Sequence, residues 1–233
     1  MSSLTTPANT RAEAVMARVR KACETSGRAP DSVKIIAVSK TREAADIRAA
    51  HALGLTHFGE NYLQEALPKL EALRDLQAEW HYIGRIQSNK CKDIAGAFDW
   101  VHTVDRPRVA RRLSAARQGA PLNTLIQINV DSDPAKGGVA MDDRNALDEL
   151  MRCIIELPGL ELRGCMTILA QETDPADGFT RLKRCFDTIA PDAARHWDTL
   201  SMGMSADFET AIACGATHVR IGTSIFGPRE QTE

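Results

Sequence analysis

The stretch LIQINV at residues 125–130 is predominantly apolar, and so are IIAV at 35–38 and CMTIL at 165–169. A strand of a parallel sheet is buried on both faces and therefore carries such a run. A strand with one solvated face alternates apolar and polar residues instead. These three stretches predict a parallel sheet.

Outward from these stretches, short apolar runs alternate with longer amphipathic segments along the chain. Strands are predicted at residues 33–39, 57–59, 80–83, 100–104, 122–130, 160–168, 199–202 and 217–221. Helical spacing of apolar residues predicts helices at 43–53, 62–73, 107–116, 141–157, 176–189 and 206–214. Eight such strands predict an α/β protein with a closed (β/α)8 TIM barrel. A doubly wound open sheet is the alternative, but it needs fewer strands.

An extra helix is predicted before the first strand. Thr10 and Glu13 are spaced as a capping box, apolar residues then recur at helical spacing as far as Cys23, and Gly27 closes the segment. After the last predicted strand about a dozen residues remain, and no Gly/Ser-rich linker divides the chain. We therefore expect residues 1–233 to form a single domain, with no second domain.

The composition is that of an ordinary globular protein. The chain has 233 residues, 29 of them Lys or Arg and 31 Asp or Glu, and 43% are hydrophobic. This near-neutral balance gives no general electrostatic reason to bind nucleic acid, which attracts basic stripes. The longest stretch without charge, residues 118–130, has 13 residues, whereas a membrane-spanning helix needs about 20 apolar ones. Neither nucleic acid nor membrane is expected as a partner.

The cysteines and histidines are dispersed. The six cysteines include no CxxC pair, and the start of the chain lacks a basic segment followed by an apolar block. This pattern predicts reduced, mostly packed thiols in a cytoplasmic protein without a secretory signal. The six histidines show no HxxxH or HxH spacing, and no metal site is predicted from them.

Lys40 comes directly after the first predicted strand, in the sequence AVSK. Barrel enzymes place their chemistry at the carboxyl ends of strands. A lysine there is either a solvated surface charge or a partly desolvated amine with a lowered pKa, which can attack an aldehyde to form a Schiff base.

The last two predicted strands end in MGMS at residues 202–205 and in IGTS at 221–224. Loops at these two positions of a barrel commonly bind phosphate through backbone N–H groups and hydroxyls, although Ser205 could be only a helix cap and Gly222 only a turn. A lysine opposite a phosphate site fits a ligand with both an aldehyde and a phosphate. Pyridoxal 5′-phosphate has both, but the sugar phosphate of an aldolase fits the same pattern.

A set of motifs decides between these ligands by resemblance. In chain order they are AVSKT at residues 37–41, FGENY at 58–62, WHYIG at 80–84, QSNK at 87–90, LRGCM at 162–166, LSMGMS at 200–205 and VRIGTSIFG at 219–227. Together they closely resemble the pyridoxal phosphate homeostasis protein family over most of the chain. This resemblance implies a barrel like that of alanine racemase, which is fold type III of the pyridoxal phosphate proteins. It also implies a covalently bound cofactor, no established turnover, and a role in buffering and handing over the cofactor.

Roles for particular residues follow from the resemblance alone. Lys40 would be the Schiff-base lysine, Arg220 would face the pyridine nitrogen, and the phosphate would be held by Ser205, Gly222 and Thr223. Lesser wall residues would be Asn61, His81 and Met204. The chain departs from the family pattern at RI of residues 85–86 and at AKGG of residues 135–138. Both loops should lie near the mouth of the barrel, where access of the cofactor would differ.

Several features predict a carrier and not a catalyst. An arginine can only donate to the pyridine nitrogen, which leaves the ring unprotonated and a poorer sink for a carbanion. Racemases of similar barrel type share that arginine yet remain active. However, no second domain is expected here to supply an opposing acid or base, and Tyr62 and Tyr82 are explained as barrel packing. The alternatives are an amino-acid racemase-like enzyme and an aldolase that uses Lys40.

Basic residues near the predicted mouth have two interpretations. Arg85, Lys90 and Lys92 follow the third strand and are either a solvated helix start or a path that steers the cofactor phosphate, and Lys136 could serve similarly. The partners that we expect are pyridoxal phosphate and recipient apo-enzymes. A lone barrel favours a monomer.

Overall fold

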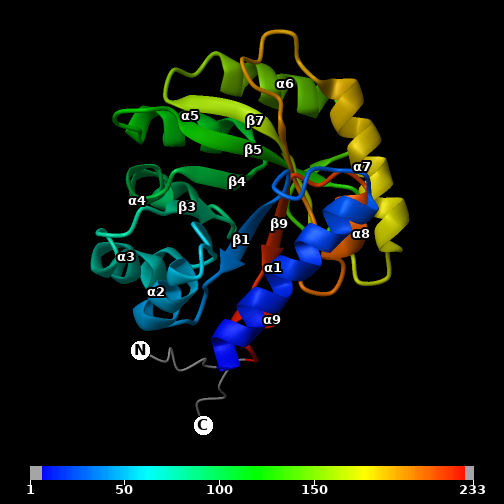
Figure 1. Cartoon of the computed structure of the whole chain (residues 1–233). Coiled ribbons are helices and arrows are strands. Elements are labelled where there is room, and N and C mark those ends of the chain that lie inside the picture. The colour runs from blue at the N-terminus through cyan, green and yellow to red at the C-terminus, as the bar shows by residue number, and fades with distance from the viewer. Residues whose placement is uncertain (1–6, 229–233) are drawn as a thin grey trace.

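The structure, a computed structural model, describes residues 7–228, with side chains from Thr10 onward, and its centre is a closed barrel of parallel strands (Figure 1). Around the ring the strands pair in the order β1-β2-β3-β4-β5-β7-β8-β9 and back to β1, and the pairing of β4 with β5 closes the barrel. Their bounds are β1 Lys34–Val38, β2 His57–Glu60, β3 Glu79–Tyr82, β4 Trp100–Val104, β5 Leu122–Asn129, β7 Leu160–Met166, β8 Thr199–Ser201 and β9 His218–Ile221. All eight lie where the sequence predicts them.

Helices surround these strands on the outside, as Figure 1 shows. They are α1 Pro7–Thr25, α2 Ala44–Ala52, α3 Leu63–Ala72, α4 Cys91–Ala97, α5 Pro107–Ala116, α6 Arg144–Ile155, α7 Pro175–Ile189, α8 Phe208–Ala213 and α9 Thr223–Phe226, with a 3-10 turn at Ser88–Lys90. The prediction of a (β/α)8 barrel is therefore confirmed, and the open sheet is excluded because the ring closes.

The sequence did not predict three short elements. These are α4, α9 and the strand β6, Val139–Ala140, which extends the sheet beside the end of β5. The start of α1 was also predicted wrongly, because the helix begins at Pro7 and Thr10 lies inside it. Proline is tolerated in the first turn of a helix, where its missing N–H has no acceptor to lose. The end was predicted correctly, since Gly27 has a left-handed φ of 69° just after Thr25.

Helix α1 completes the outer ring. The helix after the last strand, α9, has only four residues, and α1 lies beside it and beside α8 (Figure 1). Two arginines attach α1 and the loop that follows it: Arg18 pairs with Glu209 at 2.6 Å, and Arg28 donates to the carbonyl oxygens of Ile212 and Ala216 at 2.9 and 2.7 Å. The extra amino-terminal helix thus fills the place that a short last helix leaves open.

The barrel has two different cores. The larger one lies between the strands and the helices and includes the fully buried Phe58, Phe98, Phe179 and Phe208. Inside the barrel a small apolar cluster of Trp100, Leu125 and Met166 lies beside four histidine rings, those of His57, His81, His102 and His218. Barrel interiors are usually filled by branched aliphatic residues. Here buried ring nitrogens must find hydrogen-bond partners inside the barrel.

Among the described residues, none of the helices is long and apolar enough to cross a membrane.

Candidate functional site

The carboxyl ends of three neighbouring strands bring the predicted cofactor residues to one side of the barrel mouth. Lys40 follows β1, Gly222 and Thr223 follow β9, and Ser205 follows β8. Ala37 and Ile221 are paired between β1 and β9, and a Cβ on Gly222 would lie 3.3 Å from the carbonyl oxygen of Val38. Neighbouring strands are about 4.8 Å apart, so one small molecule can span the roughly 10 Å from β1 to β8.

The backbone around Lys40 is held by side chains of β2 and α3. The Ser39 hydroxyl donates to Glu60 Oε1 at 2.7 Å, and the Lys69 ammonium donates to the carbonyl oxygen of Ser39 at 2.8 Å. The backbone N–H of Thr41, which has a left-handed φ of 62°, donates to the carboxylate of Glu65. Lys40 itself is half-buried. Contacts on both sides of Lys40 therefore fix the direction in which its chain leaves the strand.

Lys69 is the centre of this clamp. Its ammonium lies 2.6 Å from Glu60 Oε1 and 2.7 Å from Glu65 Oε1, and only 9% of its side chain is exposed. With the Ser39 carbonyl it has three acceptors for its three N–H groups. Burial raises the pKa of Glu60, against the opposite effect of its hydrogen bond from Lys69. Sequence reasoning missed Lys69 and Glu65, although their i, i+4 spacing on a helix was a possible signal.

The loop after β8 is a tight turn. Met204 N donates to Asp207 Oδ1 at 2.6 Å, and Asp207 N donates back to the Met204 carbonyl at 3.1 Å. Gly203 has a φ of 89°, and a Cβ there would lie 2.5 Å from the Cβ of Ala211. Ser205 therefore stands at the tip of a turn that requires glycine, and Met204 is 42% exposed beside it.

The loop after β9 leads directly into α9, whose first residue is Thr223. The first N–H groups of any helix have no intrahelical acceptor. The exposed Thr223 and the half-buried Ser205 thus bring hydroxyls to the same side of the mouth, beside backbone donors.

Arg220 is a buried cation that forms no ion pair within residues 7–228. It is 4% exposed, and its guanidinium donates to Ser201 Oγ and to the Thr167 carbonyl, both at 2.7 Å. No carboxylate of the described residues forms an ion pair with it. Burial lowers its pKa to about 10, although the Asp207 carboxylate acts on it through space and raises the pKa, so Arg220 remains charged at neutral pH. A buried charge with only neutral partners is costly, and such a cation is suited to an acceptor supplied by a ligand.

Two buried acceptor atoms beside the mouth lack a partner. They are Glu60 Oε2 and Asn61 Oδ1, at the end of β2. The Asn61 backbone packs closely on Gly84, where a Cβ would lie 1.9 Å from the Asn61 carbonyl oxygen, so position 84 requires glycine. Buried polar groups normally form hydrogen bonds. Two buried acceptors without a donor are therefore typical of a site where a ligand supplies the donor.

His81 lies inside the barrel and is fully buried. Its Nε2 is 3.1 Å from His57 Nδ1, and its Nδ1 is 2.9 Å from His102 Nε2. Both ring nitrogens are engaged inside the barrel, so His81 offers a cofactor at the mouth only the carbon surface of its ring. Its predicted role as a wall residue of the cofactor site stays a prediction.

A chain of hydrogen bonds runs from His57 to Arg220. It continues from His102 Nδ1 to Ser201 Oγ at 3.0 Å, and Ser201 in turn accepts from Arg220. Burial lowers the pKa of the three histidines in it, so their rings are neutral. A neutral ring has one donor and one acceptor nitrogen. All three rings must therefore donate their hydrogen bonds in the same direction along the chain. Sequence reasoning missed this chain, because its members come from five strands: β2, β3, β4, β8 and β9.

The two tyrosines differ. Tyr82 is buried, packs against Phe98 with ring centroids 5.2 Å apart, and donates to the Arg85 carbonyl at 3.3 Å. Its prediction as a packing residue is correct. Tyr62 is 55% exposed at the start of α3, so the same prediction was wrong for it. The residue directly before a helix often faces solvent, and the FGENY motif gave no sign of this.

All four of the predicted basic residues can be placed. Lys136 Nζ donates to the Ile168 carbonyl at 3.3 Å, just after β7, so its loop reaches the mouth as expected. Arg85 and Lys92 are exposed, whereas Lys90 is half-buried in the 3-10 turn. Their steering of a phosphate stays a prediction.

Known proteins resemble this chain over nearly its whole length. The family model described as alanine racemase, N-terminal domain, matches residues 11–230. The pyridoxal phosphate homeostasis protein of Pseudomonas aeruginosa is 49% identical over 221 residues, covering 93% of each chain. That of Escherichia coli K12 is 43% identical over 223 residues, covering 93% of this chain and 94% of the other.

A solved structure agrees with these relatives. PipY of Synechococcus elongatus, determined with PLP bound, is 34% identical with a TM-score of 0.74, and the match covers 91% of this chain and all of that one. The resemblance found in the motifs is thereby confirmed. The chain belongs to the alanine racemase N-terminal domain family and, within it, to the pyridoxal phosphate homeostasis proteins.

Proposed function

We propose that this protein binds pyridoxal 5′-phosphate covalently through Lys40 and buffers and delivers the cofactor without turning over a substrate. The observation that carries the proposal is Arg220, a buried cation whose partners are a hydroxyl and a carbonyl. It lies on β9 between Lys40 on one neighbouring strand and the Ser205 turn on the other. The relatives named for pyridoxal phosphate homeostasis support the same role.

The residues at the mouth fit this cofactor. Lys40 would hold its aldehyde end, Arg220 would donate to the ring nitrogen, and Ser205, Gly222 and Thr223 would hold the phosphate. The unpartnered Oδ1 of Asn61 leaves an amide beside the mouth that can still bind a ligand. When bound, the cofactor supplies an electrophilic aldehyde that a lysine amine can attack.

Other residues of the chain orient these groups. The Glu60–Lys69–Glu65 clamp fixes the backbone from Ser39 to Thr41. The direction in which the Lys40 side chain leaves the backbone is therefore set before a ligand binds. Arg220 has donors only, and a ring nitrogen facing it must act as the acceptor and stay unprotonated. This arrangement favours holding the cofactor over stabilising a carbanion on it.

A carrier role is supported by the contacts that occupy His81, His102 and Tyr82, although the exposed Tyr62 hydroxyl is not held in this way. Catalysis of racemisation needs an acid and a base, each worth about 10²–10⁴-fold. His81 and His102 use both ring nitrogens inside the barrel, and the Tyr82 hydroxyl donates to a backbone carbonyl. A racemase-like enzyme remains the second candidate because the fold is that of the alanine racemase domain. Exchange of the substrate Cα proton with deuterated solvent would support that candidate.

We further propose a cytoplasmic monomer, with the domain spanning residues 1–233, that gives its cofactor to apo-enzymes. All six cysteines are free thiols, as suits a reducing compartment. The structure describes four exposed large hydrophobic residues, which are Tyr62, Leu67, Ile168 and Met204. Such residues form no broad apolar patch of the kind that marks an obligate interface.

The test compares the wild type with Lys40→Ala and with Lys21→Ala, which removes an exposed lysine on α1. After incubation with pyridoxal phosphate, we expect the wild type and Lys21→Ala to show visible absorbance. Borohydride should fix the pyridoxyl group on the peptide that contains residue 40. Lys40→Ala should lose both signals with unchanged circular dichroism. A wild-type protein that stays colourless, or that is labelled on another lysine, would refute the proposal.

A further inference from the structure

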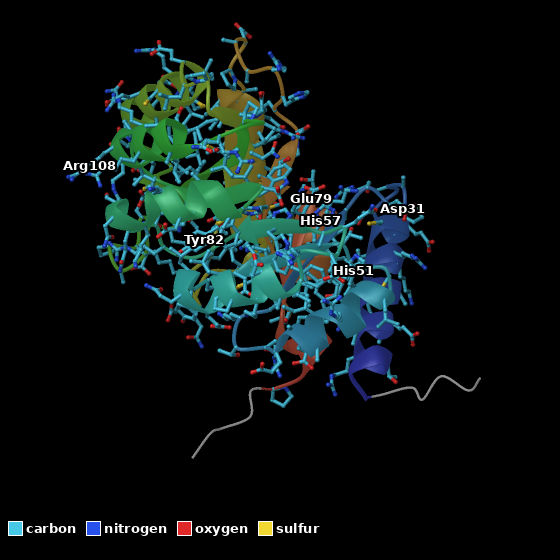
Figure 2. All side chains as sticks on the ribbon, turned by 90° about the vertical axis from the view of Figure 1, so that its left-hand side faces the viewer. Asp31, His51, His57, Glu79, Tyr82 and Arg108 are labelled. Carbon is cyan, nitrogen blue, oxygen red and sulfur yellow. The ribbon has the colours of Figure 1, made fainter. Side chains whose placement is uncertain are left out.

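Three potential metal ligands meet at the amino-terminal end of the barrel, away from the proposed cofactor site. His57 on β2 is paired in register with Glu79 on β3, and His81 lies two residues farther along β3. His57 Nδ1 is 3.1 Å from His81 Nε2 and 3.8 Å from Glu79 Oε2, and one ligand atom from each residue lies within 4.8 Å of the others. Figure 2 shows Glu79 beside His57.

These separations suit a tetrahedral ion. Bonds of about 2.0–2.1 Å to zinc place neighbouring ligand atoms roughly 3.3–3.4 Å apart. The two distances from His57 Nδ1, 3.1 and 3.8 Å, lie on either side of that value. A metal could therefore replace the proton shared by the two histidines with only small movements of the side chains.

We propose that His57, His81 and Glu79 form a binding site for a divalent transition-metal ion of the zinc type. Two imidazoles and a carboxylate are a ligand set that zinc accepts, and three protein ligands leave a fourth position open. Glu79 has 52% of its side chain exposed, so it can move to complete the site. His57 and Glu79 begin their strands, at the end of the barrel opposite to Lys40. The proposal does not rest on the proposed cofactor function, although His102 and Ser201 join His81 to Arg220.

The neighbours of the three ligands already hold them in place. His81 Nδ1 is bonded to His102, the His81 ring stacks on Trp100 with an interplanar angle of 16°, and Trp100 Nε1 bonds Glu79 Oε2 at 2.6 Å. Metal-binding histidines nearly always use their second nitrogen in this way, because the bond fixes the tautomer and the ring orientation. Little side-chain order would then have to be created when a metal binds.

A path from solvent to the site exists. His57 lines a hollow of about 320 Å³ between α1, the start of β1 and the loop before β2. Lys34, which also lines this hollow, is the cation whose charge acts on His57. The Glu79 carboxylate provides the opposite charge, so the three ligands and Zn²⁺ carry a net charge of about +1. Lys34 then favours an anion or hydroxide at the fourth position.

Metal binding would also set the direction of the hydrogen-bond chain. A metal on His81 Nε2 requires the proton of that ring on Nδ1, which must then donate to His102 Nε2. His102 in turn must carry its proton on Nδ1 and donate to Ser201 Oγ. The position of the proton on the His102 ring, which does not contact the metal, thus shows whether the metal is bound to His81.

The sequence predicted no metal site because its histidines are dispersed. His57 and His81 are 24 residues apart, and only the register between β2 and β3 brings them together. Metal binding at His57, His81 and Glu79 would make the prediction of no metal site wrong.

The test titrates the untagged full chain with Co²⁺, whose visible bands report four-coordination, and with Zn²⁺ against a chromophoric chelator. We expect one equivalent to bind. His57→Gln and Glu79→Gln should each weaken binding at least tenfold, whereas His196→Gln, which removes an exposed histidine, should leave it unchanged. Circular dichroism and thermal unfolding of each variant establish that it is folded, and two ligand variants are used so that misfolding of one leaves a test.

Three results would overturn the proposal: no binding by the wild type, equal binding by both ligand variants, or strong near-ultraviolet thiolate-to-cobalt bands, which would place the metal on cysteines. Long-range ¹⁵N–¹H spectra of the Zn²⁺-loaded chain provide an independent check. We expect the His102 proton on Nδ1, and a His102 proton on Nε2 with bound metal would exclude His81 as a ligand.

Discussion

The two ends of the barrel differ in how completely their polar groups are paired. At the carboxyl end, Glu60 Oε2 and Asn61 Oδ1 are buried without partners, and Arg220 has no carboxylate partner among the described residues. At the amino end, Arg163 forms two hydrogen bonds to Asp198 at 3.1 and 2.8 Å and a third to Asn123 at 2.8 Å. Unpaired groups cost stability, so this contrast locates the proposed cofactor site at the first end, where barrels place their chemistry.

The clamp under Lys40 is the exception at the carboxyl end, and breaking it should have the largest effect. Lys69→Met removes the cation and leaves Glu60 buried without its partner. Loss of one member of a buried ion pair costs about 3–5 kcal/mol. We expect a free energy of unfolding lower by that amount in urea titrations, together with faster loss of cofactor, because the backbone on both sides of Lys40 is released.

The matched control is the double variant Glu60→Gln with Lys69→Met, which also removes the buried carboxylate. Its stability should recover part of the loss. If Lys69→Met alone is as stable as the wild type, the clamp contributes nothing to stability.

The second prediction concerns acid stability and the amino end. Burial lowers the pKa of His218 to about 3, against about 6.5 in an unfolded chain. Between these values the unfolded state binds a proton that the folded state does not, so stability is lost as the pH falls below about 6.5. The loss for such a group is about 1.4 kcal/mol per pH unit, or about 3 kcal/mol at pH 4.

Urea titrations of the wild type, His218→Gln and His196→Gln between pH 7 and 4 measure this effect. The stability of the wild type should fall more steeply with decreasing pH than that of His218→Gln, while His196→Gln should follow the wild type. Parallel curves for the wild type and His218→Gln would mean that His218 titrates normally.

The sequence revealed the frame of the barrel better than its interior. Short, predominantly apolar runs such as IIAV are a local signal of a parallel strand. Runs of this kind predicted the positions of all eight barrel strands. The positions of Lys40 and Ser205 then followed, because a strand end is a local feature. The start of α1 was missed because the proline in its first turn is not part of the helical spacing. The whole of α9 was missed because a four-residue helix is too short to show periodicity.

The interior could not be predicted because its contacts join distant parts of the chain. His102 and Ser201 are 99 residues apart, and no spacing rule relates them. Lys69 looks like any solvated lysine on an amphipathic helix, and only the burial of Glu60 beneath it shows otherwise. The proposed contact of Arg220 with the pyridine nitrogen came from resemblance to a family motif. Only the structure shows that its hydrogen-bond partners are a neutral hydroxyl and a carbonyl.

The third prediction tests the connection between the two ends. Ser201→Ala removes the hydroxyl that joins His102 to Arg220 and should cost about 1–3 kcal/mol of stability, because both groups are buried. With Arg220 less constrained, the absorbance maximum of the bound cofactor should shift and its release should accelerate. Ser201→Thr keeps the hydroxyl and should restore both signals. A loss of stability with unchanged spectrum and release would make Ser201 a structural residue only.

The smallest expected effect belongs to the well-paired amino end. Arg163→Ala removes its bonds to Asp198 and Asn123 and its contact with the Trp100 ring, whose centroid lies 4.9 Å away. Because Asp198 has 48% of its side chain exposed, water screens the pair and the cost should be about 1–2 kcal/mol. Arg163→Lys keeps the charge but loses the paired geometry and should fall in between. The cofactor spectrum and release should stay unchanged in both variants. A change in either would show that the two ends are coupled through the barrel interior and that stability and function are not separated between them.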